Sequence, residues 1–262
     1  MDAQDELLLT PSDPDRAWRF NWVLPTLFRP RSALARVVDN PHPTWRTPLV
    51  LVMLAAAGNA VAAGTIKAAA AAAGEITLPP GFEFYTPEQQ AQFQQAATAT
   101  NNTTFNYILP ALGAVLGVII LWFLVGWLMH LMQTLLGGRG TSRAALNIAA
   151  WAALPLVARY IVQIVVMLTS DQLIAGAGLS GFAPAGEGIG HALLAGILSQ
   201  IDIYLIWQVV LLYIGLRLSS QLPRAKSWLT VLLTIAIVLA LRALPAALLA
   251  QFGGLTVIRP FI

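Results

Sequence analysis

The sequence contains no cysteine and few charged residues, and both absences narrow the possible functions. Without cysteine the chain has no disulfide, no thiol nucleophile and no cysteine-held metal cluster. Only 10% of its 262 residues are charged, whereas an average soluble domain has about 25%. The net charge is only +3, and nearly all basic residues lie beside apolar segments. We therefore interpret the basic residues as topology signals and expect no nucleic-acid partner.

Long hydrophobic runs occupy the part of the sequence where charge is missing. About 20 mainly apolar residues are enough for a helix to cross a bilayer. Five segments of at least 19 residues meet this condition, and they are 48–66, 107–133, 144–168, 191–216 and 228–250. The sequence therefore predicts an all-α polytopic membrane protein with five transmembrane helices. Too little of the chain remains outside these spans for a large soluble catalytic domain.

Two short helices are expected outside the spans. Pro30 is suited to a first helical turn, and Leu34, Val37 and Val38 follow on one face. This N-terminal interfacial helix either lies on the membrane surface or packs on the protein itself. In the first long loop, Thr86 is suited to cap a second short helix over 87–99.

These elements divide the chain into three parts. Residues 1–44 form an N-terminal segment, which begins with an acidic, proline-rich stretch expected to be loosely held. Residues 45–252 form the transmembrane domain, and 253–262 form a tail.

The distribution of lysine and arginine predicts the orientation of the chain. The segment before the first span holds six arginines, the first long loop holds only Lys67, and the loop at 169–190 holds none. Basic residues return in the connections that contain Arg139 and Lys226. Because cytoplasmic loops are enriched in basic residues, we expect a multi-pass protein of the cell membrane with a cytoplasmic N-terminus and an external C-terminus.

Three charged residues fall inside the predicted spans: Arg159, Asp202 and Arg242. At 1.5 Å of rise per residue, all three lie roughly 20–23 Å from the cytoplasmic ends of their helices. A charge at this depth is costly unless it is paired or hydrated. We therefore predict that Asp202 pairs with Arg159, Arg242 or both, with Gln163 and Gln200 nearby. The cluster either joins three spans structurally or lines a substrate or proton pathway.

Other candidate sites have simpler interpretations. His130 and His191 are expected on opposite sides of the membrane, so they do not form a paired haem or chlorophyll site, and we expect no cofactor and no metal. The Gly113-x-x-x-Gly117 pattern either allows close approach of another helix or reflects the general abundance of glycine in membrane helices. No familiar catalytic motif is present in the sequence, so an enzyme is not expected.

Spans three to five resemble the Yip family (Ypt/Rab-interacting proteins), in its bacterial branch. The similar segments, with their sequences, are 137–143 (GGRGTSR), 151–155 (WAALP), 202–207 (DIYLIW), 211–217 (LLYIGLR) and 223–228 (PRAKSW). The resemblance implies five spans and a cytoplasmic N-terminus, in agreement with the hydropathy and charge pattern. It implies no catalytic residues, and bacterial relatives are thought to assist membrane transporters, including ABC-type efflux systems.

Two hypotheses for function follow from these features. The first is a non-enzymatic integral membrane protein that acts as an accessory or scaffold subunit of a larger membrane complex and assists transport. Its partners would be the lipid bilayer and other integral membrane proteins. The alternative is a small transporter or channel that uses the Arg159, Asp202 and Arg242 cluster.

Overall fold

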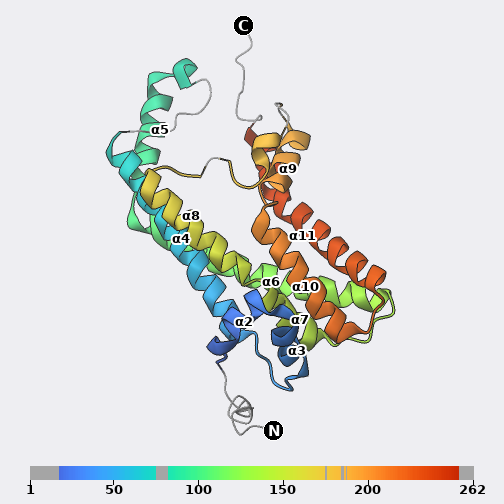
Figure 1. The fold of residues 1–262 in the computed structure, drawn as a ribbon. Helices are drawn as coiled ribbons and strands as arrows, with labels where there is room; N and C mark the ends of the chain where they lie inside the picture. Colours follow the sequence, from blue (N-terminus) through green and yellow to red (C-terminus); the bar gives the residue numbers. More distant parts are fainter. Residues whose placement is uncertain (1–17, 75–81, 175, 184–185, 187, 254–262) are drawn as a thin grey trace.

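The computed structural model describes residues 18–74, 82–174, 176–183, 186 and 188–253, and within them every regular element is a helix (Figure 1). Five helical segments are long and apolar enough to cross a membrane: Arg46–Ala72, Thr104–Leu135, Ser142–Ser170, Ile203–Ser220 and Arg224–Pro245. The predicted all-α fold with five candidate spans is therefore confirmed. The expectations for 1–17 and for the tail after 253 fall outside the described residues.

The chain contains longer helices joined by short turns. The α-helices are α2 (Val23–Phe28), α3 (Pro30–Asp39), α4 (Arg46–Ala72), α5 (Pro87–Thr100), α6 (Leu109–Leu135), α7 (Ser142–Ala152), α8 (Pro155–Ser170), α9 (Ile189–Leu198), α10 (Ile203–Ser220) and α11 (Arg224–Gly253). Short 3-10 turns lie at Phe20–Trp22 (η1), Phe82–Phe84 (η2) and Ser180–Phe182 (η4), and one π-helical turn, Thr104–Ile108 (η3), leads into α6.

Helix α5 is the predicted loop helix, and its first turn shows why it begins there. The Thr86 hydroxyl accepts the Gln89 N–H at 3.3 Å, and the Gln89 side-chain oxygen accepts the Thr86 N–H at 3.0 Å. This reciprocal capping box satisfies two N–H groups that would otherwise lack partners. Pro87 occupies the following position, where a missing N–H costs nothing.

The third and fourth hydrophobic segments are broken helices, which corrects the continuous spans expected at 144–168 and 191–216. The third segment turns at 153–154 between α7 and α8, because Pro155 has no N–H to continue the hydrogen-bond ladder of α7. The fourth is interrupted between α9, which ends at Leu198, and α10, which begins at Ile203.

A shared core at one end of the molecule, where α2, α3 and α7 gather (Figure 1), takes its buried side chains mainly from α3, α6, α7, α10 and α11. Helix α3 packs on both α7 and α10. Its apolar residues Leu34 and Val37 are buried. The apolar face of this helix is therefore covered by protein, the second of the two possibilities that its sequence allowed. The other buried side chains of this core include Trp22, Met129, Ile148, Trp151, Leu211, Leu212, Leu216 and Val231.

Two glycines allow helices in this core to approach closely. A Cβ added at Gly126 of α6 would lie 2.6 Å from the Leu146 side chain on α7. A Cβ added at Gly215 of α10 would collide with Ile148, which is fully buried on the same α7. By contrast, a Cβ at Gly113 or Gly117 would meet nothing within 4 Å. The Gly-x-x-x-Gly pattern therefore makes no close contact with another helix among the described residues.

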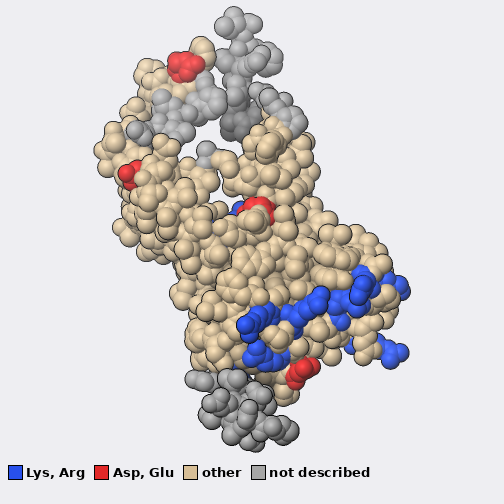
Figure 2. Space-filling view, in the orientation of Figure 1, with Lys and Arg blue, Asp and Glu red and all other residues tan. Residues whose placement is uncertain are grey.

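Away from this core the helices separate into two arms. Helices α4 and α8 pack on each other in one arm, and α9 packs on α11 in the other (Figure 1). The space-filling surface is hollowed between the arms, and an acidic side chain lies beside a basic one at the floor of this opening (Figure 2). The arms thus enclose a recess whose base is charged.

Basic side chains gather at the opposite end, which carries the core (Figure 2). Three connections meet there, because Arg143 donates to the Pro41 carbonyl at 3.0 Å and Lys226 donates to the Leu136 carbonyl at 3.0 Å. The exposed basic residues of this end, here called the basic rim, are Arg29, Arg31, Arg36, Arg46, Arg139, Arg143, Arg224 and Lys226.

Candidate functional site: an intramembrane charge cluster

An ion pair between Arg159 and Asp202 lies where the broken fourth segment meets α8. The Arg159 Nε is 2.9 Å from Asp202 Oδ2, and the two side chains are 13% and 17% exposed. It is the one ion pair between residues that the structure describes. The other carboxylate oxygen, Oδ1, accepts the Leu205 N–H at 2.9 Å. Both oxygens of Asp202 are therefore already engaged.

Asp202 fits this position because it is the N-cap of α10. Its backbone is extended, and its side chain replaces the carbonyl acceptor that a continuous helix would have supplied. A negative charge is also favoured at a helix N-terminus, where the helix dipole is positive. The acid is thus held by a local helix start as well as by Arg159.

Arg159 also reaches the far side of the same break. Its Nη2 lies 3.4 Å from the carbonyl oxygen of Ser199, at the C-terminal end of α9. Carbonyls at a helix C-terminus lack intrahelical partners and carry partial negative charge. One guanidinium therefore contacts the end of one helix and the start of the next.

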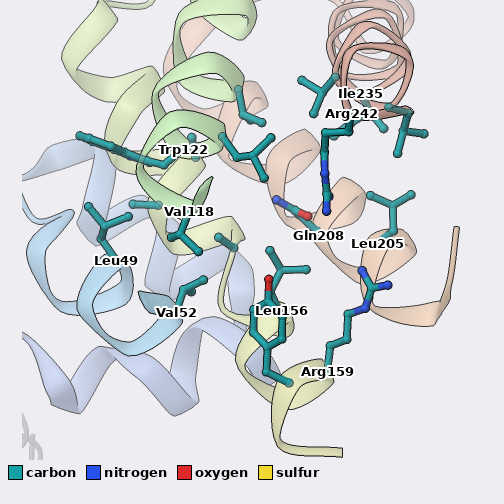
Figure 3. Close-up of a pocket in the computed structure, with 18 residues that line it drawn as sticks. Leu49, Val52, Val118, Trp122, Leu156, Arg159, Leu205, Gln208, Ile235 and Arg242 are labelled. Carbon is teal, nitrogen blue, oxygen red and sulfur yellow. The ribbon is translucent and has the colours of Figure 1, made fainter. Parts of the chain in front are cut away.

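Arg242 on α11 extends into a cavity from the side opposite Arg159 (Figure 3). The cavity has a volume of about 60 Å³, which is large enough to hold water. Its lining is mostly apolar, with Trp122 and Leu156 among the residues that border it. The structure brings the two arginines to one cavity, but the ion pair of Asp202 is with Arg159.

Sequence reasoning missed Gln208 and Tyr160, which border the same cavity. The Gln208 side chain is 8% exposed and lies beside the end of Arg242 (Figure 3). Gln208 follows Asp202 by six residues in the same apolar run, so its polarity was a visible signal. Counting residues along a helix gives the depth of a side chain in the membrane but not the direction in which it points. That direction depends on the rotation of each helix about its axis, and it decides which polar groups border the same cavity.

The glutamines named from the sequence have other surroundings. The Gln200 side chain donates to the carbonyls of Gly196 at 2.9 Å and Leu239 at 3.3 Å, so it joins α9 to α11. Gln163 is half-buried on α8 and does not border the cavity.

The two candidate histidines lie at separate places. His130 of α6 is 3.0 Å from the Gln133 amide, which also donates to the Gly140 carbonyl in the turn before α7. His191 is in the first turn of α9. Among the described residues, no three His, Asp or Glu side chains come together as a metal site would require.

Five hydrophobic helical segments, two of them accompanied by a helix break, define a polytopic α-helical membrane protein. The family model of the Yip1 domain matches residues 25–244, which extend from α2 into α11 and include all three charges of the cluster. The chain belongs to the Yip family. No curated protein and no solved structure matches it.

Proposed function

We propose that this Yip-family protein is a non-enzymatic accessory or scaffold subunit of a larger membrane complex. The observation that supports this is the recess between the arms, where helices that pack tightly at the core end are separated (Figure 2). A transmembrane helix of a partner placed there would contact α8 and shield the Arg159–Asp202 pair from lipid. Such shielding is favourable because polar groups in a membrane are usually directed toward protein or water.

The proposed setting is the cell membrane, with the basic rim on the cytoplasmic side. This end of the chain is rich in exposed arginine and lysine, whereas the described segments at and beyond the other ends of the spans carry Lys67 and the acids Glu83, Glu88 and Asp171. Basic residues favour the cytoplasmic side of the membrane. The N-terminus would then be cytoplasmic and the C-terminus external.

Photocrosslinking from two adjacent valines tests the accessory role. Val166 lies two turns beyond Arg159 on the same face of α8, and Val165 lies on another face. Both are similarly exposed, at 46% and 55%. With a photoreactive side chain at each position in intact cells, we expect Val166 to crosslink to one membrane protein and Val165 to crosslink to lipid, as read by mass spectrometry.

The crosslinked protein must also co-purify in a fixed ratio with the unmodified chain in mild detergent. The same complex should be lost when Val166 is replaced by Trp, which fills the recess, and retained with Val165→Trp. Equal crosslinking from both positions, or a complex indifferent to both Trp variants, contradicts the proposal.

A second candidate function is that of a small transporter or channel, and the helix break at Asp202 favours it. In many transporters, substrate sites lie near the middle of the membrane at discontinuous helices. Here the end of α9, the start of α10 and Arg159 meet at such a break, beside a cavity. The feature against this candidate is the lack of a visible internal repeat in the sequence.

Reconstitution distinguishes the two functions. If the chain transports by itself, purified protein in liposomes will release a trapped solute or carry protons, and Asp202→Asn will abolish this flux while the protein remains assembled. If it is an accessory subunit, the liposomes stay as tight as protein-free ones, and activity appears only after the co-purified partner is added. The variant Arg224→Gln, in the basic rim, is a control that should leave either result unchanged.

A further inference from the structure

Arg242 carries a positive charge that forms no ion pair with a described residue. Asp202, the acid nearest to the cluster, uses one oxygen for Arg159 and the other for the Leu205 N–H. No ion pair or hydrogen bond joins Arg242 to another described residue. An unpaired guanidinium within a hydrophobic helix segment is costly unless water or an anion compensates it.

Further donors lie beside Arg242 around the same cavity. Gln208 is more than nine-tenths buried, and Figure 3 shows its amide beside the Arg242 guanidinium. The Tyr160 hydroxyl belongs to a third helix that borders the cavity. Neither side chain has a hydrogen-bond partner within the described part of the chain. The Gln208 amide atoms are not among the fully buried unpartnered atoms of the described residues, so this amide is accessible from the cavity and free to donate to a ligand.

We propose that this cavity binds an oxyanion group, a phosphate, with Arg242 as its main ligand and Gln208 as a second donor. The planar guanidinium fork matches two oxygens of such a group. The volume of about 60 Å³ suits an ion of a few heavy atoms. The mostly apolar lining lowers the local dielectric constant below that of water, which strengthens charge interactions. This binding would occur in either an accessory subunit or a transporter.

Two sources can supply this chemistry. A free oxyanion would enter from water through the recess, and the phosphate of an anionic lipid would enter from the bilayer between the arms. Both sources would contact Arg242, but only the second requires an anionic lipid in the membrane. Changing the lipid composition therefore distinguishes them.

The test measures thermal unfolding of the full-length protein in lipid nanodiscs, followed by tryptophan fluorescence. In phosphatidylcholine discs, inorganic phosphate is titrated against chloride at equal ionic strength. In a second arm, phosphatidylglycerol replaces part of the phosphatidylcholine in the absence of phosphate. A ligand that binds only the folded state raises the unfolding temperature in a concentration-dependent manner.

We expect a rise in unfolding temperature in the phosphate arm if the ligand is a free ion, and only in the phosphatidylglycerol arm if it is a lipid headgroup. The variant Arg242→Gln should lose the response, and Gln208→Leu should weaken the apparent affinity roughly ten-fold or more. Arg224→Gln, which alters an exposed arginine of the basic rim, should respond like the unchanged protein.

Two results would overturn the proposal. One is the same unfolding temperature in all conditions, which means that no oxyanion binds. The other is an unchanged response in both Arg242→Gln and Gln208→Leu, which places any bound anion elsewhere. If Arg242→Gln does not fold, Gln208→Leu alone decides, because it removes an amide without removing a charge.

Discussion

Replacing Asp202 with alanine is expected to destabilise the protein by several kcal/mol, because the substitution removes two interactions at once. The Arg159 guanidinium loses its acid partner, and loss of one partner of a buried pair costs about 3–5 kcal/mol. The lower part of this range applies, since the two side chains remain 13% and 17% exposed. Loss of the α10 cap adds about 0.5–2 kcal/mol. The measurement is the free energy of unfolding in detergent, followed by tryptophan fluorescence.

Three further variants separate the two contributions. Asp202→Asn keeps an oxygen for the Leu205 N–H, so it should cost about 1 kcal/mol less than alanine. Arg159→Met leaves the carboxylate without a partner, and the double variant Arg159→Met with Asp202→Asn leaves no charge unpaired. The double variant should therefore be more stable than the sum of the two single losses indicates. Additive losses would show that the pair contributes nothing to stability.

Gly215→Leu is expected to prevent the close packing of α10 on α7. Even a single added carbon would lie 3.0 Å from Ile148 Cγ1 and closer still to Cγ2. Ile148 is β-branched and fully buried, so it has no space to move into. Overpacking a core typically costs about 1–3 kcal/mol, and a whole leucine side chain here should reach or exceed the upper value. We expect a lower unfolding temperature and a smaller folded fraction in detergent.

Gly113→Leu provides the matched control on α6. An added Cβ there meets nothing within 4 Å, so the leucine should be tolerated, and the better helix former should contribute up to about 1 kcal/mol. A large loss of stability in Gly113→Leu measured on the isolated chain would contradict the helix arrangement. If Gly113→Leu left the isolated chain stable but disrupted a complex in cells, α6 would be in contact with another protein.

The sequence predicted the elements whose signals are local. Five long apolar runs were enough for the number of spans, and Thr86 and Pro87 were enough for the start of α5. The ion pair of Asp202 was among the predicted alternatives because equal depths in neighbouring spans brought Arg159 within reach. In each case the prediction needed only the residues of one segment or the number of residues along a helix.

The helix breaks and the cavity were not predicted, for two different reasons. Average hydropathy treats Pro155 and Asp202 as isolated exceptions within apolar runs, although each locally begins a helix. Gln208 and Arg242 border the same cavity because of the way in which α10 and α11 are rotated and packed. That relation is set by the whole bundle, and no single stretch of sequence contains it.

The packing of α3 on α10 has a consequence for biogenesis. About 160 residues separate Asp39 from Ile203, so at roughly 5–20 residues per second α3 leaves the ribosome on the order of 10 to 30 s before α10 exists. During that interval Leu34 and Val37 have only part of their native cover, from α2 and, once it is made, from α7. The nascent chain therefore needs a temporary shelter for this helix, such as the bilayer surface or a chaperone, and a stall before the fourth span would leave it exposed to degradation.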